Sequence, residues 1–471
     1  MAESFRSRHR EALLFLGIFG LSRLFYYALG VRFQLRPLNW YWQVVDPQLL
    51  ADRPLECLLH LHSQPPLWNA YLALVLQFPE PLQAPLFAGS FLLTGLAIAW
   101  GLYTLLGELG IPLPVRSAVT ALFAAAPAVV LYENQLFYDY PVLAALIWSA
   151  LLLHRFLARG STAALAGCCA LLAALVLTRS LFHLAYLLAA VAGLTAVSGP
   201  ARGRVLRWGG AAILVAGTWY LHTWLLFGSF SASSWFGMSV AKMVVRTATA
   251  EERAALAEAS PETRILGQMP FRPLPEYAAI VPLPAPTGIP LLDRLEKRPG
   301  IVNYHHLGYV AVAERFRRAA AWAILHRPWL YLRGLGTAWR LYFRSPADEK
   351  LLEPNASVIE PVERWYRLAC GQLRRMTVRD QVGPGEFAWL LLAAWLGGIA
   401  SGARYLLREG GRSPRGAAVA FMLATILYVA AAGNSLDLGE NNRFGLLVLP
   451  FVLCLLALAT VRGAAVPVRD R

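Results

Sequence analysis

The topology of this chain depends on residues 67–78, which read LWNAYLALVLQF. The segment is apolar and follows Pro65-Pro66, but it is only 12 residues long. A helix that crosses a bilayer needs about 17–25 residues. Whether this short segment crosses determines which side of the membrane every later loop occupies.

The composition indicates a polytopic membrane protein. Of the 471 residues, 57% are hydrophobic and 15% are charged, and the mean hydropathy is +0.48. A soluble globular chain carries about 25% charged residues. Ten apolar segments are long enough to cross: 11–31, 82–106, 115–132, 141–157, 162–178, 180–198, 208–227, 387–407, 417–433 and 444–461. The predicted fold class is therefore an all-α polytopic membrane protein with about ten transmembrane helices.

The positions of the arginines favour a topology in which 67–78 does not cross. In that case the arginine-rich loops near 154–159, 202–207 and 404–415 all share the cytoplasmic side with the N-terminal cluster Arg6–Arg10. If the segment crossed, the loops at 154–159 and 202–207 would lie outside, against the positive-inside rule. We therefore expect ten spans with both termini cytoplasmic and an interfacial helix at 67–78.

This topology divides the chain into three parts. Residues 1–227 form a seven-span module, 228–386 a large extracytoplasmic loop, and 387–471 a three-span module. The first apolar run is too long for the core of a signal peptide, so we expect a retained span. Within the loop, 308–344 mixes arginines with tryptophans and tyrosines, which is typical of interfacial helices.

The charge pattern bears on the source of the chain and on its binding partners. The net charge is +15, and 40 of the 43 basic residues are arginine, a bias that suggests a GC-rich bacterial genome. Most arginines lie in short loops between apolar runs, so nucleic acid is not an expected partner. The five cysteines show no CxxC or His/Cys spacing, and they predict neither a zinc site nor a disulfide framework.

With this topology the ionisable residues outside the cytoplasm gather on one membrane face. Charged groups at membrane depth are costly and usually have a functional or a paired role. Plainer interpretations exist for each residue: Asp46 starts a turn, Asp139 caps a helix, Arg179 pairs with a nearby carboxylate, and Arg443 anchors a helix at the interface. The candidate site residues on this face, which include two neutral amides, are Asp46, His62, Gln64, Glu133, Asp139, Arg179, His183, Glu440, Asn441 and Arg443.

The order of these motifs resembles the GT-C superfamily of membrane glycosyltransferases, in particular its protein O-mannosyltransferase and aminoarabinose-transferase branch. The matching elements are Asp46, Gln64-Pro65-Pro66-Leu67, Asp139 before Pro141, Arg179, and Glu440-Asn441-Asn442-Arg443-Phe444. The likeness covers the first seven spans and the last external loop. One departure is Gln64, which stands where the branch has a lysine that faces the lipid phosphate.

The resemblance implies an inverting glycosyltransferase (EC 2.4 class) that moves a sugar from a polyprenyl-phosphate donor to an acceptor at the extracytoplasmic face of the bacterial inner membrane. Asp46 would act as the general base with Asp139 beside it. Cations would stabilise the leaving phosphate, so Arg179, Arg443, His62 and Gln64 are its expected ligands. Glu133, His183, Glu440 and Asn441 would contact acceptor or sugar. No cofactor or metal ligand is assigned, and a divalent metal stays open.

Two other classes of protein fit the same composition. A transporter or flippase for a lipid-linked or anionic substrate would suit many spans rich in glycine and proline, but no inverted repeat is visible and the charges gather at one face instead of the midplane. A non-catalytic scaffold would use the large loop to bind a partner. Replacing Asp46 would separate an enzyme from both.

Overall fold

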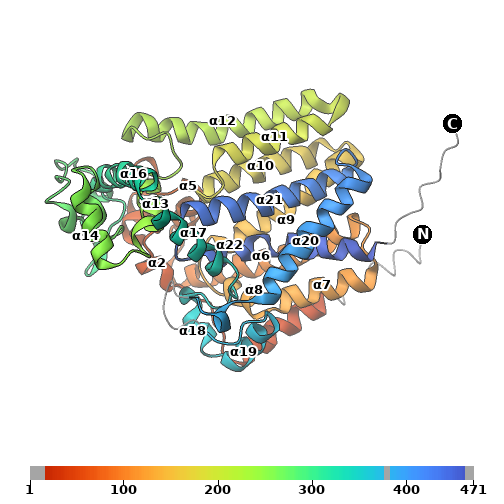
Figure 1. The fold of residues 1–471 in the computed structure, drawn as a ribbon. Helices are drawn as coiled ribbons and strands as arrows, with labels where there is room; N and C mark the ends of the chain where they lie inside the picture. The colour runs from red at the N-terminus through yellow and green to blue at the C-terminus, as the bar shows by residue number, and fades with distance from the viewer. Residues whose placement is uncertain (1–15, 376–381, 462–471) are drawn as a thin grey trace.

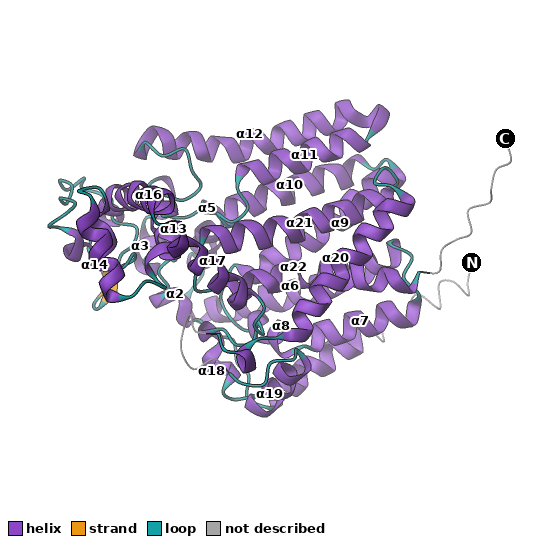
Figure 2. Cartoon of the chain, viewed as in Figure 1, coloured by secondary structure: helices purple, strands orange, loops and turns teal. Residues whose placement is uncertain are grey.

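The computed structural model describes residues 16–375 and 382–461, and helices dominate both ranges. The two short strands named there, β1 (Glu296–Arg298) and β2 (Ile301–Val302), form an antiparallel hairpin (Figure 2). The predicted all-α class is thus correct. Short 3₁₀ helices occupy Gly199–Ala201, Thr263–Gly267, Leu274–Tyr277, Lys350–Leu352, Pro384–Glu386 and Leu458–Thr460.

The long helices lie side by side in one bundle (Figure 1). The described part of each predicted apolar segment falls mainly on one of them, except that 115–132 falls on two. Residues 1–15, with the predicted Arg6–Arg10 cluster, and 462–471 lie outside the described part. The bundle contains a helix over 16–28, α6 (Glu80–Glu108), α7 (Leu113–Ala125), α8 (Pro127–Glu133), α9 (Asp139–Arg159), α10 (Thr162–Thr178), α11 (Leu184–Val197), α12 (Arg202–Phe227), α20 (Trp389–Glu409), α21 (Pro414–Leu436) and α22 (Asn441–Ala457).

Six helices in the described residues are long and apolar enough to cross a membrane: α6, α9, α12, α20, α21 and α22. The bent pair α7 and α8 makes a seventh if it counts as one span. The apolar helices α10 and α11 are shorter, with 17 and 14 residues. The chain is therefore a multi-pass membrane protein by the length and composition of its helices.

The predicted span 115–132 is broken, with an angle of 56° between α7 and α8. Pro127 starts α8, and its ring and missing N–H prevent one continuous helix. The helix over 16–28 satisfies the carbonyls exposed by the break. The Nη1 of Arg23 donates to Ala124 O (2.7 Å), and the hydroxyl of Tyr26 donates to Ala125 O (3.0 Å).

The arginine-rich loops meet at one end of the bundle. Arg155 and Arg159 pair with Glu108 at 3.4 and 2.7 Å, and Arg415 Nε donates to the Glu108 carbonyl (3.2 Å). Arg204 donates to Gly160 O (2.8 Å). The ends of α6, α9, α12 and α21 that the sequence assigned to one side of the membrane therefore lie together.

The first loop and the large loop cover the opposite end. The first loop forms four short helices, and α5 matches the segment 67–78 that was predicted to be helical. They are α2 (Arg36–Trp40), α3 (Pro47–Asp52), α4 (Pro54–Leu59) and α5 (Pro66–Leu76).

Residues 235–330 share a second hydrophobic cluster, separate from that of the bundle, and we call this part the lobe. Gly237 lets α13 approach α16 closely, since a Cβ there would overlap Ala313 O. The segment 308–344 forms α16 and α17, and α17 bridges the lobe to α22. The helices of the large loop are α13 (Phe236–Val245), α14 (Ala250–Ala259), α15 (Pro290–Asp293), α16 (Gly308–His326), α17 (Pro328–Tyr342), α18 (Glu353–Ala356) and α19 (Glu360–Ala369).

Candidate active site

Asp139 holds two arginines at the end of the bundle that faces the lobe. It is the first residue of α9 and is fully buried. Arg443, in the first turn of α22, donates through Nε to Asp139 Oδ2 (2.9 Å), and Arg179, directly after α10, pairs with Oδ1. A single carboxylate thus joins three helices, and the plainer interpretation of Arg179 as a carboxylate partner is confirmed.

Aromatic side chains and hydroxyls fix the two guanidinium groups. Arg443 donates to the hydroxyls of Tyr41 (3.2 Å) and Tyr138 (3.3 Å) and also pairs with Glu440. Its Cζ lies 4.4 Å from the centre of the Phe137 ring. Arg443 and Arg179 are only 1% and 4% exposed, so both charges are almost entirely removed from bulk water.

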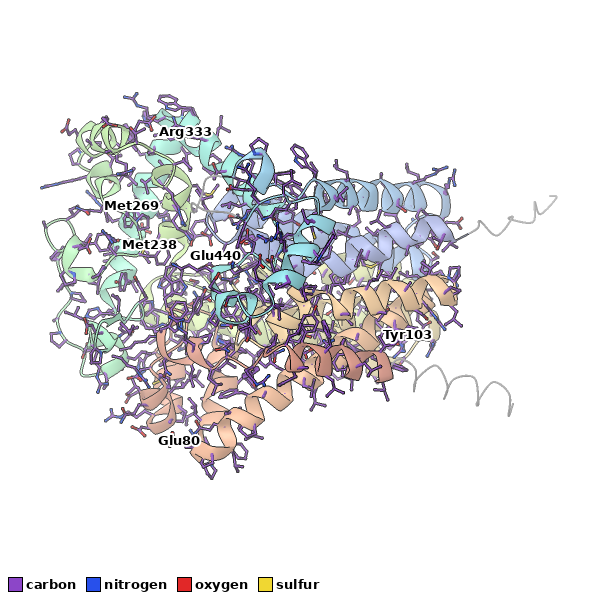
Figure 3. The ribbon with its side chains drawn as sticks, turned by 90° about the horizontal axis from the view of Figure 1, so that it is seen from below. Glu80, Tyr103, Met238, Met269, Arg333 and Glu440 are labelled. Atoms are coloured by element: carbon purple, nitrogen blue, oxygen red, sulfur yellow. The ribbon has the colours of Figure 1, made fainter. Side chains whose placement is uncertain are left out.

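Both arginines line a cavity of about 210 Å³ at the junction of bundle, first loop and lobe. Figure 3 shows Glu440 at this junction, between the lobe with Met238 and Met269 and the bundle that carries Tyr103. Five predicted site residues line the cavity: Gln64, Arg179, His183, Glu440 and Arg443.

Two charged lining residues, Lys242 and Asp437, were not assigned a role from the sequence. Lys242 of α13 forms an ion pair with Asp437, which follows α21, and its Nζ lies 5.2 Å from the centre of the Phe271 ring. Only three lysines occur in the chain, so the isolation of Lys242 in an arginine-rich sequence was the one available signal. The cavity wall therefore combines the cations of Arg179, Lys242 and Arg443 with the carboxylates of Asp437 and Glu440.

Asp46 lies outside this cavity. It caps α3 by accepting a hydrogen bond from Gln48 N (3.2 Å), and it faces Arg294 and Arg298 at 3.8 Å each. The plainer interpretation of Asp46 as a turn and cap residue therefore describes its contacts. A general base must reach the acceptor proton directly or through one water, so this position does not favour Asp46 as the base.

The buried Lys297 attaches the β1–β2 hairpin to the first loop. Its Nζ donates to Tyr41 O (2.6 Å) and Val44 O (3.0 Å). Burial lowers the pKa of Lys297 to about 7, although the nearby Asp46 acts in the opposite direction. The loop that carries Tyr41 is thereby held against Arg443 from the lobe side.

His62 also lies outside the cavity and has no free ring nitrogen. Its Nδ1 is 2.7 Å from Ser234 Oγ and its Nε2 is 2.9 Å from His305 O. Burial lowers its pKa to about 4. A neutral, fully hydrogen-bonded imidazole does not provide a cation for phosphate, so His62 serves here to join the first loop to the lobe.

The remaining predicted residues have contacts of their own. Glu133 pairs with Arg23 at 2.6 Å, away from the cavity. Asn441 donates to Asn434 Oδ1 (3.0 Å) and Asp437 O (3.0 Å), and so shapes the turn between α21 and α22. His183 caps α11 by accepting from Ala185 N (3.2 Å) while it lines the cavity.

Within residues 16–375 and 382–461, no group of three or more His, Cys, Asp or Glu side chains lies close enough to hold a metal ion.

Comparison with known proteins found no family model, no curated protein and no solved structure that matches the chain. The functional assignment therefore depends on the chemistry of the cavity.

Proposed function

We propose that this protein is an inverting glycosyltransferase that uses a polyprenyl-phosphate sugar as donor. The observation that carries the proposal is the pair of buried arginines, Arg179 and Arg443, which Asp139 holds at the wall of one cavity. Two buried guanidinium groups at the wall of one cavity provide hydrogen-bond donors that suit a desolvated anion such as a phosphate.

Arginine suits this role better than lysine would. Its planar guanidinium group binds phosphate oxygens in pairs, and it stays charged when buried. The aromatic and hydroxyl contacts of Arg443 fix its orientation before a ligand arrives. Fixed cations stabilise the charge that develops on a leaving phosphate without reorganisation during the reaction.

We assign the general base to Asp437 in place of Asp46. The side chain of Asp437 is 30% exposed and that of Glu440 is 15% exposed, so Asp437 is the more accessible of the two cavity carboxylates. Asp437 would take the proton of the acceptor as the acceptor oxygen or nitrogen attacks the anomeric carbon. The bond from that carbon to the phosphate oxygen breaks, and the phosphate leaves with the electron pair. Attack from the opposite side inverts the anomeric centre.

Glu440 and Gln64 complete the assignment. Glu440 pairs with Arg443 and faces the same cavity, so it would orient the sugar and position Arg443. Gln64 replaces the lysine of the GT-C branch and lines the cavity as a neutral hydrogen-bonding group. Lys242, on the lobe side, would supply the positive charge that the lysine of the branch has and Gln64 lacks.

A second, larger cavity suits the lipid portion of the donor. Its volume is about 920 Å³, and it shares His183, Ser231, Ser233 and Phe236 with the first. Apolar side chains contribute much of its wall, among them Phe227, Phe230, Leu307 and Val310. A polyprenyl chain in this space would leave its phosphate at the arginines.

The proposed topology keeps ten spans with the cavity on the extracytoplasmic side. The meeting of arginine-rich loops at the far bundle end supports a common cytoplasmic side for them. The short α10 and α11 would cross where the bilayer thins around them. We place the protein in the bacterial inner membrane with both termini in the cytoplasm.

Binding of radiolabelled polyprenyl-phosphate sugars to purified protein tests the proposal. One member of a panel should bind to wild type, and Arg179→Ala and Arg443→Ala should each weaken that binding more than the corresponding lysine variants. Removing a desolvated charged contact costs on the order of 2–5 kcal/mol. Arg333→Ala is the matched control, because Arg333 is exposed and pairs with Glu252 of α14 at 2.8 Å. Equal binding by the cavity variants and the control would contradict the phosphate site.

A further inference from the structure

Helix α19 buries an ion pair and exposes two large apolar side chains. Glu363 and Arg367 are 1% and 7% exposed and pair with each other at 3.0 Å inside the protein. Trp365 and Leu368, on the opposite side, are 74% and 38% exposed. A helix at the surface of a soluble protein shows the reverse arrangement.

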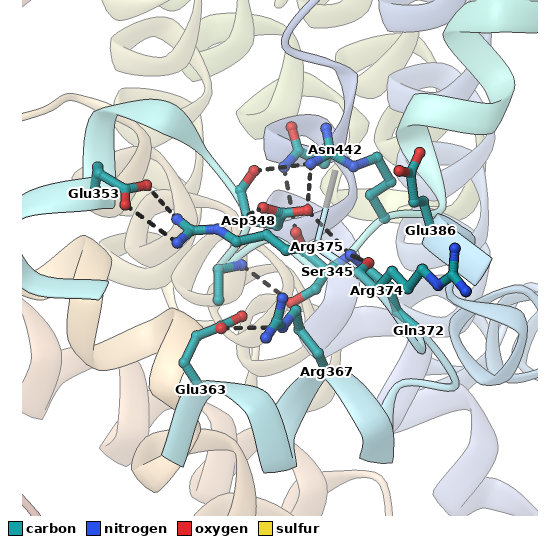
Figure 4. A network of polar contacts seen from close by, with 12 residues as sticks. Ser345, Asp348, Glu353, Glu363, Arg367, Gln372, Arg374, Arg375, Glu386 and Asn442 are labelled. Carbon is teal, nitrogen blue, oxygen red and sulfur yellow. Dashed lines mark hydrogen bonds and ion pairs between the residues drawn. The ribbon is translucent and has the colours of Figure 1, made fainter. Parts of the chain in front are cut away.

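The protein supplies partners for the buried polar side (Figure 4). Behind α19, Asp348 pairs with Arg344 and with Arg375 (3.2 Å), and Gln372 donates to Asp348 Oδ2 (3.0 Å). Glu363 and Arg367 are thus ion-paired inside the protein, next to this network and away from bulk water. The apolar side chains Trp365 and Leu368 face the surroundings of the protein.

The neighbours of α19 show what surrounds it. Asn355, just before α19, exchanges hydrogen bonds with the backbone of Arg32 (3.1 and 2.8 Å), which follows the helix over 16–28. At the other end, Leu390 of α20 donates its N–H to Cys370 O (3.1 Å). Helix α19 also packs against α8. It therefore lies between the lobe-side ends of two bundle helices, next to the broken span (Figure 1).

Those two bundle helices expose large apolar side chains next to α19. Leu24 and Phe25 of the helix over 16–28 are 67% and 52% exposed, and Trp389 and Leu390 of α20 are 56% and 57% exposed. Side chains of this kind on membrane-spanning helices face acyl chains. Trp365 and Leu368 of α19, which lies between these two helices, are exposed as well.

The exposed part of α19 is itself divided into two stripes. Glu360 and Arg364 lie one turn apart, and Pro361, Trp365 and Leu368 form the adjacent apolar stripe. A charged stripe beside an apolar stripe with a tryptophan is the pattern of a helix lying in the plane of the interface. The boundary between the stripes gives the expected level of the head groups.

We propose that α19 is an interfacial membrane helix, with Trp365 and Leu368 among the acyl chains of the leaflet on the lobe side of the bundle and Glu360 and Arg364 among the head groups. The occupant of the exposed face is thus the bilayer and not a protein partner. This role is independent of the chemistry in the cavity. The polar network behind α19 also contacts α22, because Asn442 donates to Ser345 O (3.3 Å) one residue before Arg443.

Nitroxide labels at single cysteines test this assignment in proteoliposomes of phosphatidylethanolamine and phosphatidylglycerol. The native cysteines are first replaced, and labels are placed at 360, 364, 365 and 368 one at a time. We expect labels at 365 and 368 to collide more with dissolved oxygen than with a water-soluble nickel chelate, and labels at 360 and 364 to show the opposite preference. Glu276, exposed in the lobe, provides the reference position in water.

Each outcome is decisive for the assignment. Similar nickel accessibility at 365, 368 and 276 would place α19 in water and overturn the proposal. Low accessibility of 365 and 368 to both reagents would mean that protein covers this face, either a second copy or another chain. That result would also overturn the proposal. Because all four labelled positions are exposed, the labels should leave the fold intact, which the thermal unfolding temperature of each variant checks.

Discussion

Asp139 is the residue on which the candidate site depends most. Its removal would leave Arg179 and Arg443 buried without their shared partner, and breaking such a pair costs about 3–5 kcal/mol. We expect Asp139→Asn to lower the thermal unfolding temperature in detergent and to weaken donor binding.

Asp46→Asn is the comparison for that variant. Asparagine caps a helix about as well as aspartate does, and Asp46 lies outside the cavity. We therefore expect nearly normal donor binding and turnover. An inactive Asp46→Asn beside an active Asp139→Asn would return the base role to Asp46, as the sequence suggested.

The contacts of His62 and His305 predict how stability depends on pH. Burial lowers the pKa of His62 from 6.5 to about 4 and that of His305 from 6.5 to about 3. Between these values and 6.5 the unfolded chain binds more protons than the folded chain, so stability is present above pH 6.5 and is lost as the pH falls. For His62 the loss by pH 4 is on the order of 3 kcal/mol.

Thermal unfolding in detergent between pH 7 and pH 5 measures this effect. His62→Gln should be less stable at pH 7 but should show a shallower decline than wild type. His326→Gln, at an exposed position of α16, should retain the wild-type slope. A slope unchanged in His62→Gln would show that His62 does not titrate as its burial predicts.

Several residues that line the candidate cavity were selected from the sequence, but their contacts with one another were not. Arg179, Arg443, Gln64, His183 and Glu440 were found from motif order and sidedness, and they share one cavity. Asp46 and His62 matched the motifs of the family equally well, but they lie outside this cavity. The conformation of a loop depends on tertiary contacts, such as that between His62 and Ser234, which the motifs do not reveal. The contact of Asp139 with Arg443, 304 positions apart, depends on helix packing that one sequence does not encode locally.

At the scale of elements, the apolar segments were predicted well because a buried or lipid-facing helix must satisfy its own backbone. The break between α7 and α8 was missed, although Pro127 lies inside the predicted span. The break is held by Arg23, which donates to Glu133 Oε1 (2.9 Å), while Tyr140 donates to Glu133 Oε2 (2.7 Å). Gly95 provides room for the Glu133 carboxylate.

This buried pair gives a prediction about the broken span. Arg23→Met and Glu133→Gln should each destabilise the protein by about 3–5 kcal/mol, because each leaves an unpaired buried group. The double variant should lose clearly less than the sum of the two. Unfolding in detergent measures this, with Arg53→Met as the control, since the exposed Arg53–Glu56 pair is worth about 0–1 kcal/mol. Additive losses would mean that the two residues act independently.

For the whole molecule, the proposed sidedness of the bundle rests on its arginine-rich end. In a background without native cysteines, new cysteines at 52 and 276 should react with a membrane-impermeant thiol reagent in intact cells. Cysteines at 159, 203 and 412 should react only after permeabilisation. All five positions are exposed at the protein surface. A cysteine that does not react in intact cells is therefore shielded by the membrane and not by burial within the protein. Labelling of 159 and 203 from outside would reverse the first part of the topology.

The release of sugar from a polyprenyl-phosphate donor tests the central claim most directly. Purified protein in proteoliposomes is incubated with radiolabelled donor and with a membrane extract as the source of acceptor. We expect wild type and Arg333→Ala to move the label from the lipid to an acceptor. Arg443→Ala should lower this transfer, and Asp437→Asn should lower it by about 10²–10⁴-fold, the scale of general base catalysis. Label that stays on every donor with wild type, or that moves equally with Asp437→Asn and Arg443→Ala, would contradict a glycosyltransferase site in this cavity.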